Sequence, residues 1–127
     1  MTEGSQRLTM PPAPGCLTDL RHWARSWMEH HPTDGVDPDI VVLSMTELVT
    51  NSIKHGSGPV EVQLNGDSDN LVLIVGDRSE LPPRRPVTSI DVESGRGLVI
   101  LESLATRWGV QPGVGGGKSV WCEFASP

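Results

Sequence analysis

The 127-residue sequence has no apolar run near the about 18 residues that a membrane-spanning helix needs, and no signal-peptide pattern at its N-terminus. We therefore expect a soluble, cytoplasmic protein. Cysteine is scarce: Cys16 and Cys122 lack the close spacing of metal ligands, so free thiols are expected ahead of a disulfide. Basic residues are also few, since 10 Lys and Arg against 16 Asp and Glu give a net charge of −6. This balance argues against nonspecific binding to nucleic acid or anionic membranes, because both require a basic surface.

The length of the chain indicates one domain, residues 1–127. A chain of this size buries about two thirds of its unfolded surface, which is enough for a hydrophobic core.

The stretch from Pro38 to Gly58 predicts one long helix. Pro38 and Asp39 suit a first turn, because proline loses no needed donor there and a carboxylate faces the positive end of the helix dipole. Gly56 is expected to end the helix. At about 100° per residue, one broad face carries no charge: Val41, Val42, Met45, Leu48, Val49, Ser52 and Ile53. The opposite stripe holds Glu47, Asn51, Lys54 and His55.

This polar stripe has two interpretations. A carboxylate and an amide one turn apart can share a hard cation and a water, and a lysine one turn further on can neutralise phosphate oxygens. The alternative is a solvated face opposite a core face. The spacing alone leaves both open.

An earlier helix is expected from about Cys16 to His31, after an edge strand at Arg7–Met10. Its buried face would hold Leu17, Leu20, Ala24, Trp27, Met28 and His31, with Trp23 beside them. His30 and His31 point different ways, so we interpret them as cations at the helix C-terminus and not as a metal pair.

A hairpin follows the long helix. Alternating residues from Val60 to Leu64 predict a half-exposed strand, and Asn65–Asn70 is strong turn chemistry. The continuous apolar run Leu71–Val75 predicts a central strand that is covered on its far side. This strand ends in Gly76-Asp77.

The C-terminal third combines loops, a helix and two strands. Leu81–Glu93 is expected to be a loop, with Arg84 and Arg85 solvated. Gly95 and Gly97 open an expected helix, where backbone N–H groups can converge on an anion. Its apolar face would comprise Leu98, Leu101, Leu104, Ala105 and Trp108. Strands are predicted at Arg107–Gln111 and Lys118–Phe124.

Gly117-Lys118-Ser119 invites interpretation as a phosphate-binding P-loop. We reject it, because the required first glycine falls at Pro112 and a strand is expected after Ser119 instead of a helix.

These motifs, in this order, resemble those of the GHKL ATPase superfamily. The helix pattern E-x-x-x-N-x-x-K-H, from Glu47 to His55, resembles its N-box. Asp77 matches the aspartate that accepts from the adenine amine, although Ser79 and Leu81 replace both glycines of the D-x-G-x-G pattern. Gly95-Arg96-Gly97-Leu98 is similar to the second glycine box, and Ser119 stands for the threonine of the last motif.

The resemblance implies a Bergerat, histidine-kinase-like fold. This is an α/β (α+β) two-layer sandwich with a mixed, mostly antiparallel sheet, and it binds ATP with Mg²⁺. Asn51 would ligate Mg²⁺, Glu47 would act as general base, and Asp77 would hold adenine. The resemblance assigns the phosphate contacts to Lys54, His55, Gly95, Arg96, Gly97 and Ser119, and it counts Leu98 of the second glycine box among the residues that bind the nucleotide.

Within the superfamily, the chain looks like the small anti-sigma-factor serine/threonine kinases of actinobacteria. We expect no sensor kinase, because the sequence has neither upstream dimerisation helices nor a phospho-acceptor histidine segment. The resemblance implies phosphorylation of a STAS-domain anti-anti-sigma factor, sequestration of a sigma factor, and a homodimer for which the N-terminal strand is a candidate edge. Two alternatives stay open: an ATP-binding or partner-binding module without useful kinase activity, and a scaffold that holds a sigma factor without nucleotide.

Overall fold

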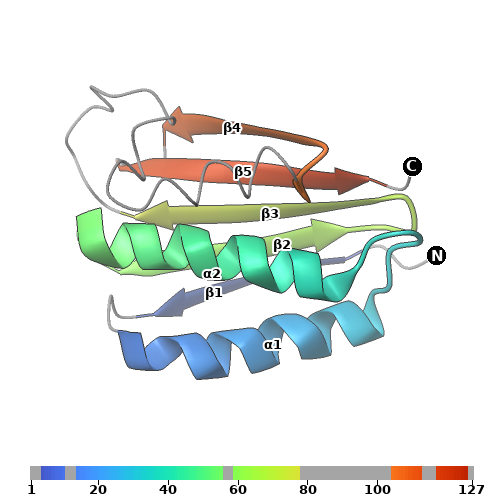
Figure 1. The fold of residues 1–127 in the computed structure, drawn as a ribbon, viewed down its shortest axis with the longest axis horizontal. Helices are drawn as coiled ribbons and strands as arrows, with labels where there is room; N and C mark the ends of the chain where they lie inside the picture. Colours follow the sequence, from blue (N-terminus) through green and yellow to red (C-terminus); the bar gives the residue numbers. More distant parts are fainter. Residues whose placement is uncertain (1–3, 11–13, 56–58, 78–103, 113–116, 126–127) are drawn as a thin grey trace.

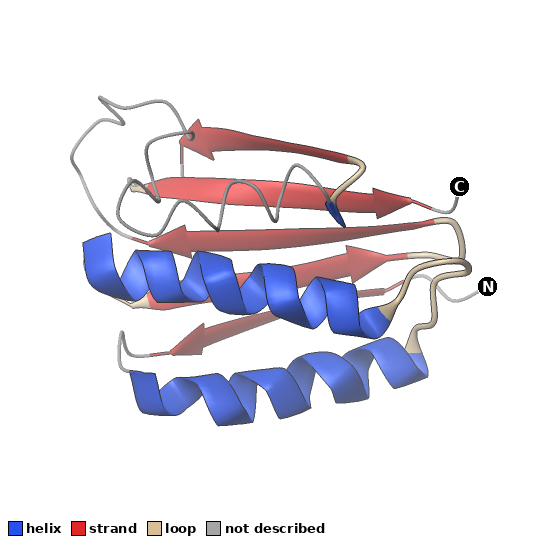
Figure 2. Ribbon diagram, viewed as in Figure 1, coloured by secondary structure: helices blue, strands red, loops and turns tan. Residues whose placement is uncertain are grey.

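The computed structural model describes residues 4–10, 14–55, 59–77, 104–112 and 117–125, and for 4–10, 14, 54 and 55 it describes the backbone alone. The elements are β1 (Gly4–Met10), the short 3₁₀ helix η1 (Pro14–Cys16), α1 (Leu17–His30), α2 (Pro38–His55), β2 (Val60–Gly66), β3 (Asn70–Asp77), β4 (Arg107–Pro112) and β5 (Lys118–Ala125). Figure 1 shows α1 and α2 side by side across one face of the sheet, and Figure 2 separates the two layers by colour. The predicted two-layer sandwich of helices and strands is confirmed.

The sheet has five strands in the order β1-β2-β3-β5-β4. β3 is central, as its apolar run predicted, and β1 and β4 form the two edges. The mixed sheet that we expected is antiparallel at every pairing between described strands. Antiparallel strands can be joined by short turns, and β2 and β3 are joined in this way.

The β2–β3 turn is organised by Asp67, as its turn-rich sequence predicted. The backbone N–H groups of Asp69 and Asn70 each donate to Asp67 Oδ1 over 2.8 Å. These bonds, from Asn70 first and Asp69 second, hold the pKa of the exposed Asp67 carboxyl below its usual value.

α1 buries the face that its periodicity predicted, including Leu20, Ala24, Trp27 and Met28. At its C-terminal end, Nδ1 of His30 lies 2.7 Å from the carbonyl oxygen of Ser26. Nδ1 of His31 lies 3.0 Å from that of Trp27, and the two rings stack with centroids 4.5 Å apart. Both imidazoles therefore contact carbonyl oxygens at the C-terminal end of α1, the place that the sequence indicated, and their interpretation as cations stays a prediction.

α2 begins where Pro38 and Asp39 predicted. The backbone N–H of Asp39 donates to Asp37 Oδ1 over 2.9 Å, so Asp37 caps the first turn. Of the predicted uncharged face, five apolar residues are buried, while Ser52 and Ile53 are half-buried. Those five are Val41, Val42, Met45, Leu48 and Val49.

The core lies between the helices and the sheet. It comprises the buried faces of α1 and α2 and the inward residues of β2, β3 and β5. The two described long helices, α1 and α2, lie on one face of the sheet. On the other face of β3, Val72 and Ile74 are half-buried, and Ile74 pairs with Trp121 of β5. The predicted cover on this far side stays a prediction.

Two smaller expectations have clear outcomes. Trp108 lies in β4, so its assignment to a helix face was wrong and the strand prediction for the same stretch was right. Cys16 is half-buried and Cys122 fully buried, and both are free thiols, as predicted. Among the described helices, none combines the length and the apolar character needed to cross a bilayer.

Candidate functional site

The ends of α2 and β3 are brought together by contacts between the turns that precede them. The backbone N–H of Asp34 donates to the carbonyl oxygen of Ser68 over 2.9 Å, and Thr33 Oγ1 donates to that of Asp67 over 2.9 Å. At about 1.5 Å per helical residue and about 3.3 Å per strand residue, α2 spans roughly 27 Å and β3 roughly 26 Å. Two elements that start together and match in length also finish together, and Figure 1 shows their C-terminal ends at the same edge of the molecule.

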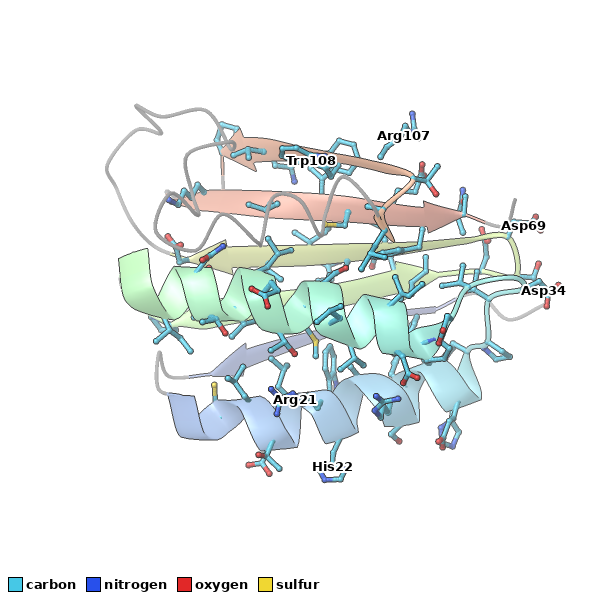
Figure 3. The ribbon with its side chains drawn as sticks, in the orientation of Figure 1. Arg21, His22, Asp34, Asp69, Arg107 and Trp108 are labelled. Atoms are coloured by element: carbon cyan, nitrogen blue, oxygen red, sulfur yellow. The ribbon has the colours of Figure 1, made fainter. Side chains whose placement is uncertain are left out.

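A contact with α1 shows which side of α2 faces that helix. Arg21 Nε donates to Thr46 Oγ1 over 3.4 Å, and Figure 3 shows Arg21 pointing from α1 toward α2. At about 100° per residue, Glu47 and Asn51 lie roughly 100° and 140° around the helix from Thr46. They therefore occupy the flank of α2 that faces away from α1, and both are half-buried.

Asp77 lies at the same end of the molecule. It is the last residue of β3 and shares the inward face of that strand with Leu71, Leu73 and Val75. Only 7% of Asp77 is exposed. A buried carboxylate is costly unless it accepts hydrogen bonds, so this position suits an acceptor for a polar group.

β5 starts beside Asp77, and its first two residues face opposite sides of the sheet. Lys118 is paired with Asp77, and Ser119 is paired with Gly76. Side chains alternate along a strand, so Lys118 faces the helices with Asp77, whereas Ser119 faces the outer side. A Cβ on Gly76 would lie 3.2 Å from the carbonyl oxygen of Lys118, so the two backbones are closely packed here.

On the side of the helices, Asn51 lies in the C-terminal half of α2, toward the end of the sandwich where β3 finishes in Asp77, and Glu47 lies one turn earlier, at the middle of the helix. Ser119 is 7% exposed at the same end, but its side chain faces away from Asp77. Lys54 and His55 belong to the last turn of α2, and their side chains lie outside the described residues. The other predicted contacts, Gly95, Arg96, Gly97 and Leu98, also lie outside the described part of the chain, as does the loop at 81–93.

Sequence reasoning missed Lys118 as a member of this site. We considered it only as a P-loop lysine, and that motif is excluded here because Ser119 continues into strand β5 and not into a helix. The sequence showed that Lys118 alternates with Val120 and Cys122 and so shares a strand face with them. It did not show which residue of β3 lies opposite Lys118, because that depends on the register between the two strands.

The chemistry of these residues fits a nucleotide with a magnesium ion. Within the described ranges, no group of three or more His, Cys, Asp or Glu residues could hold a metal ion. An ion at Asn51 would therefore draw further ligands from phosphate and water, which is how Mg²⁺ is commonly held with nucleotides. The half-buried carboxylate of Glu47, one turn from Asn51, is an acceptor for a proton or a water.

Comparison with known proteins gives a consistent result. The sequence model of a family described as histidine kinase-like ATPase domain matches residues 10–123. An uncharacterized protein of Streptomyces coelicolor is 37% identical over 86 residues, which are 64% of this chain and 81% of that protein.

A solved structure shares the fold. The crystal structure of the RsbU and RsbW domains of Rv1364c from Mycobacterium tuberculosis matches 96% of this chain with a TM-score of 0.69 and 20% sequence identity. The chain spans 32% of the length of that structure.

Proposed function

This chain belongs to the histidine kinase-like ATPase family, and on that premise we propose that it is an ATP-binding serine/threonine kinase of the anti-sigma-factor type. Its substrate would be a serine of a STAS-domain anti-anti-sigma factor, and its second partner would be a sigma factor that it sequesters. The observation that supports this proposal is that β3 ends in Asp77 at the same edge of the molecule as the C-terminal end of α2, the helix that bears Glu47 and Asn51. The fold shared with a structure that contains an RsbW domain adds support for this branch of the family.

The proposed chemistry assigns one role to each residue. The Asp77 carboxylate accepts a hydrogen bond from the adenine amine. Asn51 holds Mg²⁺ through its amide oxygen, and the bound ion supplies positive charge that offsets the charge on the transferred phosphoryl group. Glu47, one turn away, orients the incoming serine hydroxyl and takes its proton.

The phosphate contacts belong to the same proposal. Lys54 and His55 follow Asn51 by three and four residues, so the helix carries them past the magnesium position. Gly95, Arg96, Gly97 and Leu98 supply backbone donors and a cation for the triphosphate. Ser119 contributes through its backbone, because its side chain faces the outer side of the sheet.

A phosphotransfer assay tests the kinase assignment. The purified protein is incubated with labelled ATP, Mg²⁺ and a STAS-domain protein, and serine phosphorylation is measured by mass spectrometry. Glu47→Gln should slow transfer by about 10²- to 10⁴-fold, the usual contribution of a general base. The matched control is Asp39→Asn, which removes a carboxylate from the first turn of α2. Undiminished transfer by Glu47→Gln would contradict the assigned role.

A second candidate is a regulatory module of the same fold that binds ATP or a partner without useful catalysis. The observation that favours it is the sequence after Asp77, where Ser79 and Leu81 replace two glycines of the family pattern. ATP binding without transfer to any STAS-domain protein would select this candidate. Sequestration of a sigma factor with no ATP binding at all would select a scaffold without nucleotide.

A further inference from the structure

The register between β3 and β5 places an acid and a base side by side at the proposed nucleotide site. Asp77 is directly opposite Lys118, after the pairs Leu73 with Cys122 and Val75 with Val120. The residues of those two preceding pairs are buried in the core beneath the helices. Directly opposed residues of antiparallel strands share a face and have Cβ atoms about 4.5–5.5 Å apart, so Lys118 and Asp77 point together toward the helices.

The surroundings of Lys118 suit a cation that binds a ligand. It is half-buried, follows a turn at Gly117 with φ 79°, and has Pro112 opposite it on β4. Its ammonium group makes no hydrogen bond or ion pair within 4.0 Å to another described residue. A half-buried lysine keeps its charge most easily where an acceptor is available, and the acidic neighbour on this face is Asp77.

We propose that Asp77 and Lys118 together read the Watson–Crick edge of adenine, with Asp77 accepting from the N6 amine and Lys118 donating to the adjacent N1. This inference rests on the proposed function and adds the residue that would determine base specificity. Adenine offers a donor at N6 and an acceptor at N1, which matches a carboxylate beside an ammonium. Guanine places an acceptor, O6, opposite the carboxylate and a donor, the N1–H group, opposite the ammonium group. Neither pair can form a hydrogen bond.

The two hydrogen bonds differ in what they contribute. The contact from Asp77 alone recognises an amine. Adding a donor at N1 also requires an acceptor immediately beside that amine, which adenine presents and guanine does not. Both bonds involve a charged partner, and such bonds are stronger than neutral ones.

The test separates the N1 contact from any other role of the lysine. Affinities for ATP and for 1-deaza-ATP, in which a C–H group replaces N1, are measured by calorimetry with the wild-type protein and with Lys118→Met. The wild-type protein should bind ATP about 10- to 100-fold more tightly than 1-deaza-ATP, the range of one charge-assisted hydrogen bond. Lys118→Met should bind the two nucleotides within about threefold of each other, at the level of the wild-type protein with 1-deaza-ATP.

Two controls accompany the measurement. Arg107→Met removes the same charge, but Arg107 is on the opposite face of the sheet, where it pairs with Glu123. It should retain the wild-type preference for ATP. Lys118→Arg keeps the charge and changes the donor geometry, so it should retain part of that preference, while circular dichroism verifies the fold of each variant.

Several outcomes would overturn the assignment. Equal binding of both nucleotides by the wild-type protein would exclude the N1 contact while leaving the proposed ATP site intact. The same would follow if Lys118→Met weakened both nucleotides alike, because that pattern indicates a phosphate contact. If the wild-type protein bound neither nucleotide, the proposed function and the base-reading pair would fail together.

Discussion

Thr33 Oγ1 donates a 2.9 Å hydrogen bond to the main-chain carbonyl oxygen of Asp67, which joins the turn before α2 to the turn before β3. This contact, with the neighbouring bond from Asp34 to Ser68, sets where α2 starts relative to β3. The two elements then run in the same direction for the same length. Their C-terminal ends therefore meet the same edge of the molecule, with Asp77 at the end of β3, and with Asn51 roughly one turn and Glu47 roughly two turns before the end of α2.

Removing the hydrogen bond from Thr33 to Asp67 should lower the stability of the folded protein. Thr33→Val keeps the shape of the side chain but loses the donor, so the free energy of unfolding should fall by about 0.5–1.5 kcal/mol. Urea denaturation followed by circular dichroism measures the change. The control is Thr18→Val, an exposed position on α1 where the described residues offer no side-chain hydrogen bond. An equal loss in both variants would show that the contact does not anchor α2.

A second stability test concerns the outer face of the sheet. A Cβ on Gly109 would lie 2.9 Å from the ring of Trp121, closer than real Cβ contacts come. Gly109→Ala must displace this ring or bend β4, and such overpacking should lower the free energy of unfolding by about 1–3 kcal/mol. Gly15→Ala is the matched control, because a Cβ there meets nothing within 4 Å. If both variants unfold at the same urea concentration, the packing of Trp121 on Gly109 is not as the structure has it.

The third test uses the buried thiol of β5. Burial raises the pKa of the Cys122 thiol to about 12, well above its usual value, because desolvation disfavours the thiolate. In the folded protein, iodoacetamide at pH 8 should leave Cys122 unmodified until urea unfolds the chain. Mass spectrometry of Cys16→Ser, which retains Cys122 as its sole cysteine, measures this directly. Alkylation in the folded state at the rate of an unfolded peptide would contradict the burial of this thiol.

The same pKa predicts a dependence of stability on pH. The folded-state pKa of Cys122 lies above its unfolded value, so the protonated thiol contributes stability fully below about pH 9. That contribution is lost as the pH rises toward 12. The difference in unfolding free energy between the wild-type protein and Cys122→Ala should therefore shrink across this range. A difference that stays constant would contradict the raised pKa.

Sequence patterns predicted most helices and strands, because capping and the periodicity of apolar residues act between residues that are close in sequence. Asp37, Pro38 and Asp39 form a first turn whose capping is decided by residues in sequence, and α2 starts there. The alternation from Val60 to Leu64 requires one buried face, and β2 has it. Trp108 fits an apolar helix face and an apolar strand face equally well. Its pairing with Cys122 on β5, a tertiary contact, decides between them.

The candidate site was predictable only in part. Glu47 and Asn51 share a stripe of α2 because helical geometry places residues four apart on one side. The position of Lys118 beside Asp77 depends on the register of two strands separated by 40 residues of sequence, which no local pattern contains. A shift of one residue would have put Ser119 on the inner face and Lys118 outside.

The central claim is that this end of the sandwich binds ATP through a magnesium ion held by Asn51. The most direct measurement is the affinity for ATP by calorimetry, with Mg²⁺ and with EDTA. The wild-type protein should bind ATP only with Mg²⁺, and Asn51→Ala should weaken that binding at least about tenfold. Gln111→Ala, which removes an exposed amide from β4, should bind as the wild-type protein does. Magnesium-independent binding, or an Asn51→Ala variant with unchanged affinity, would contradict the claim.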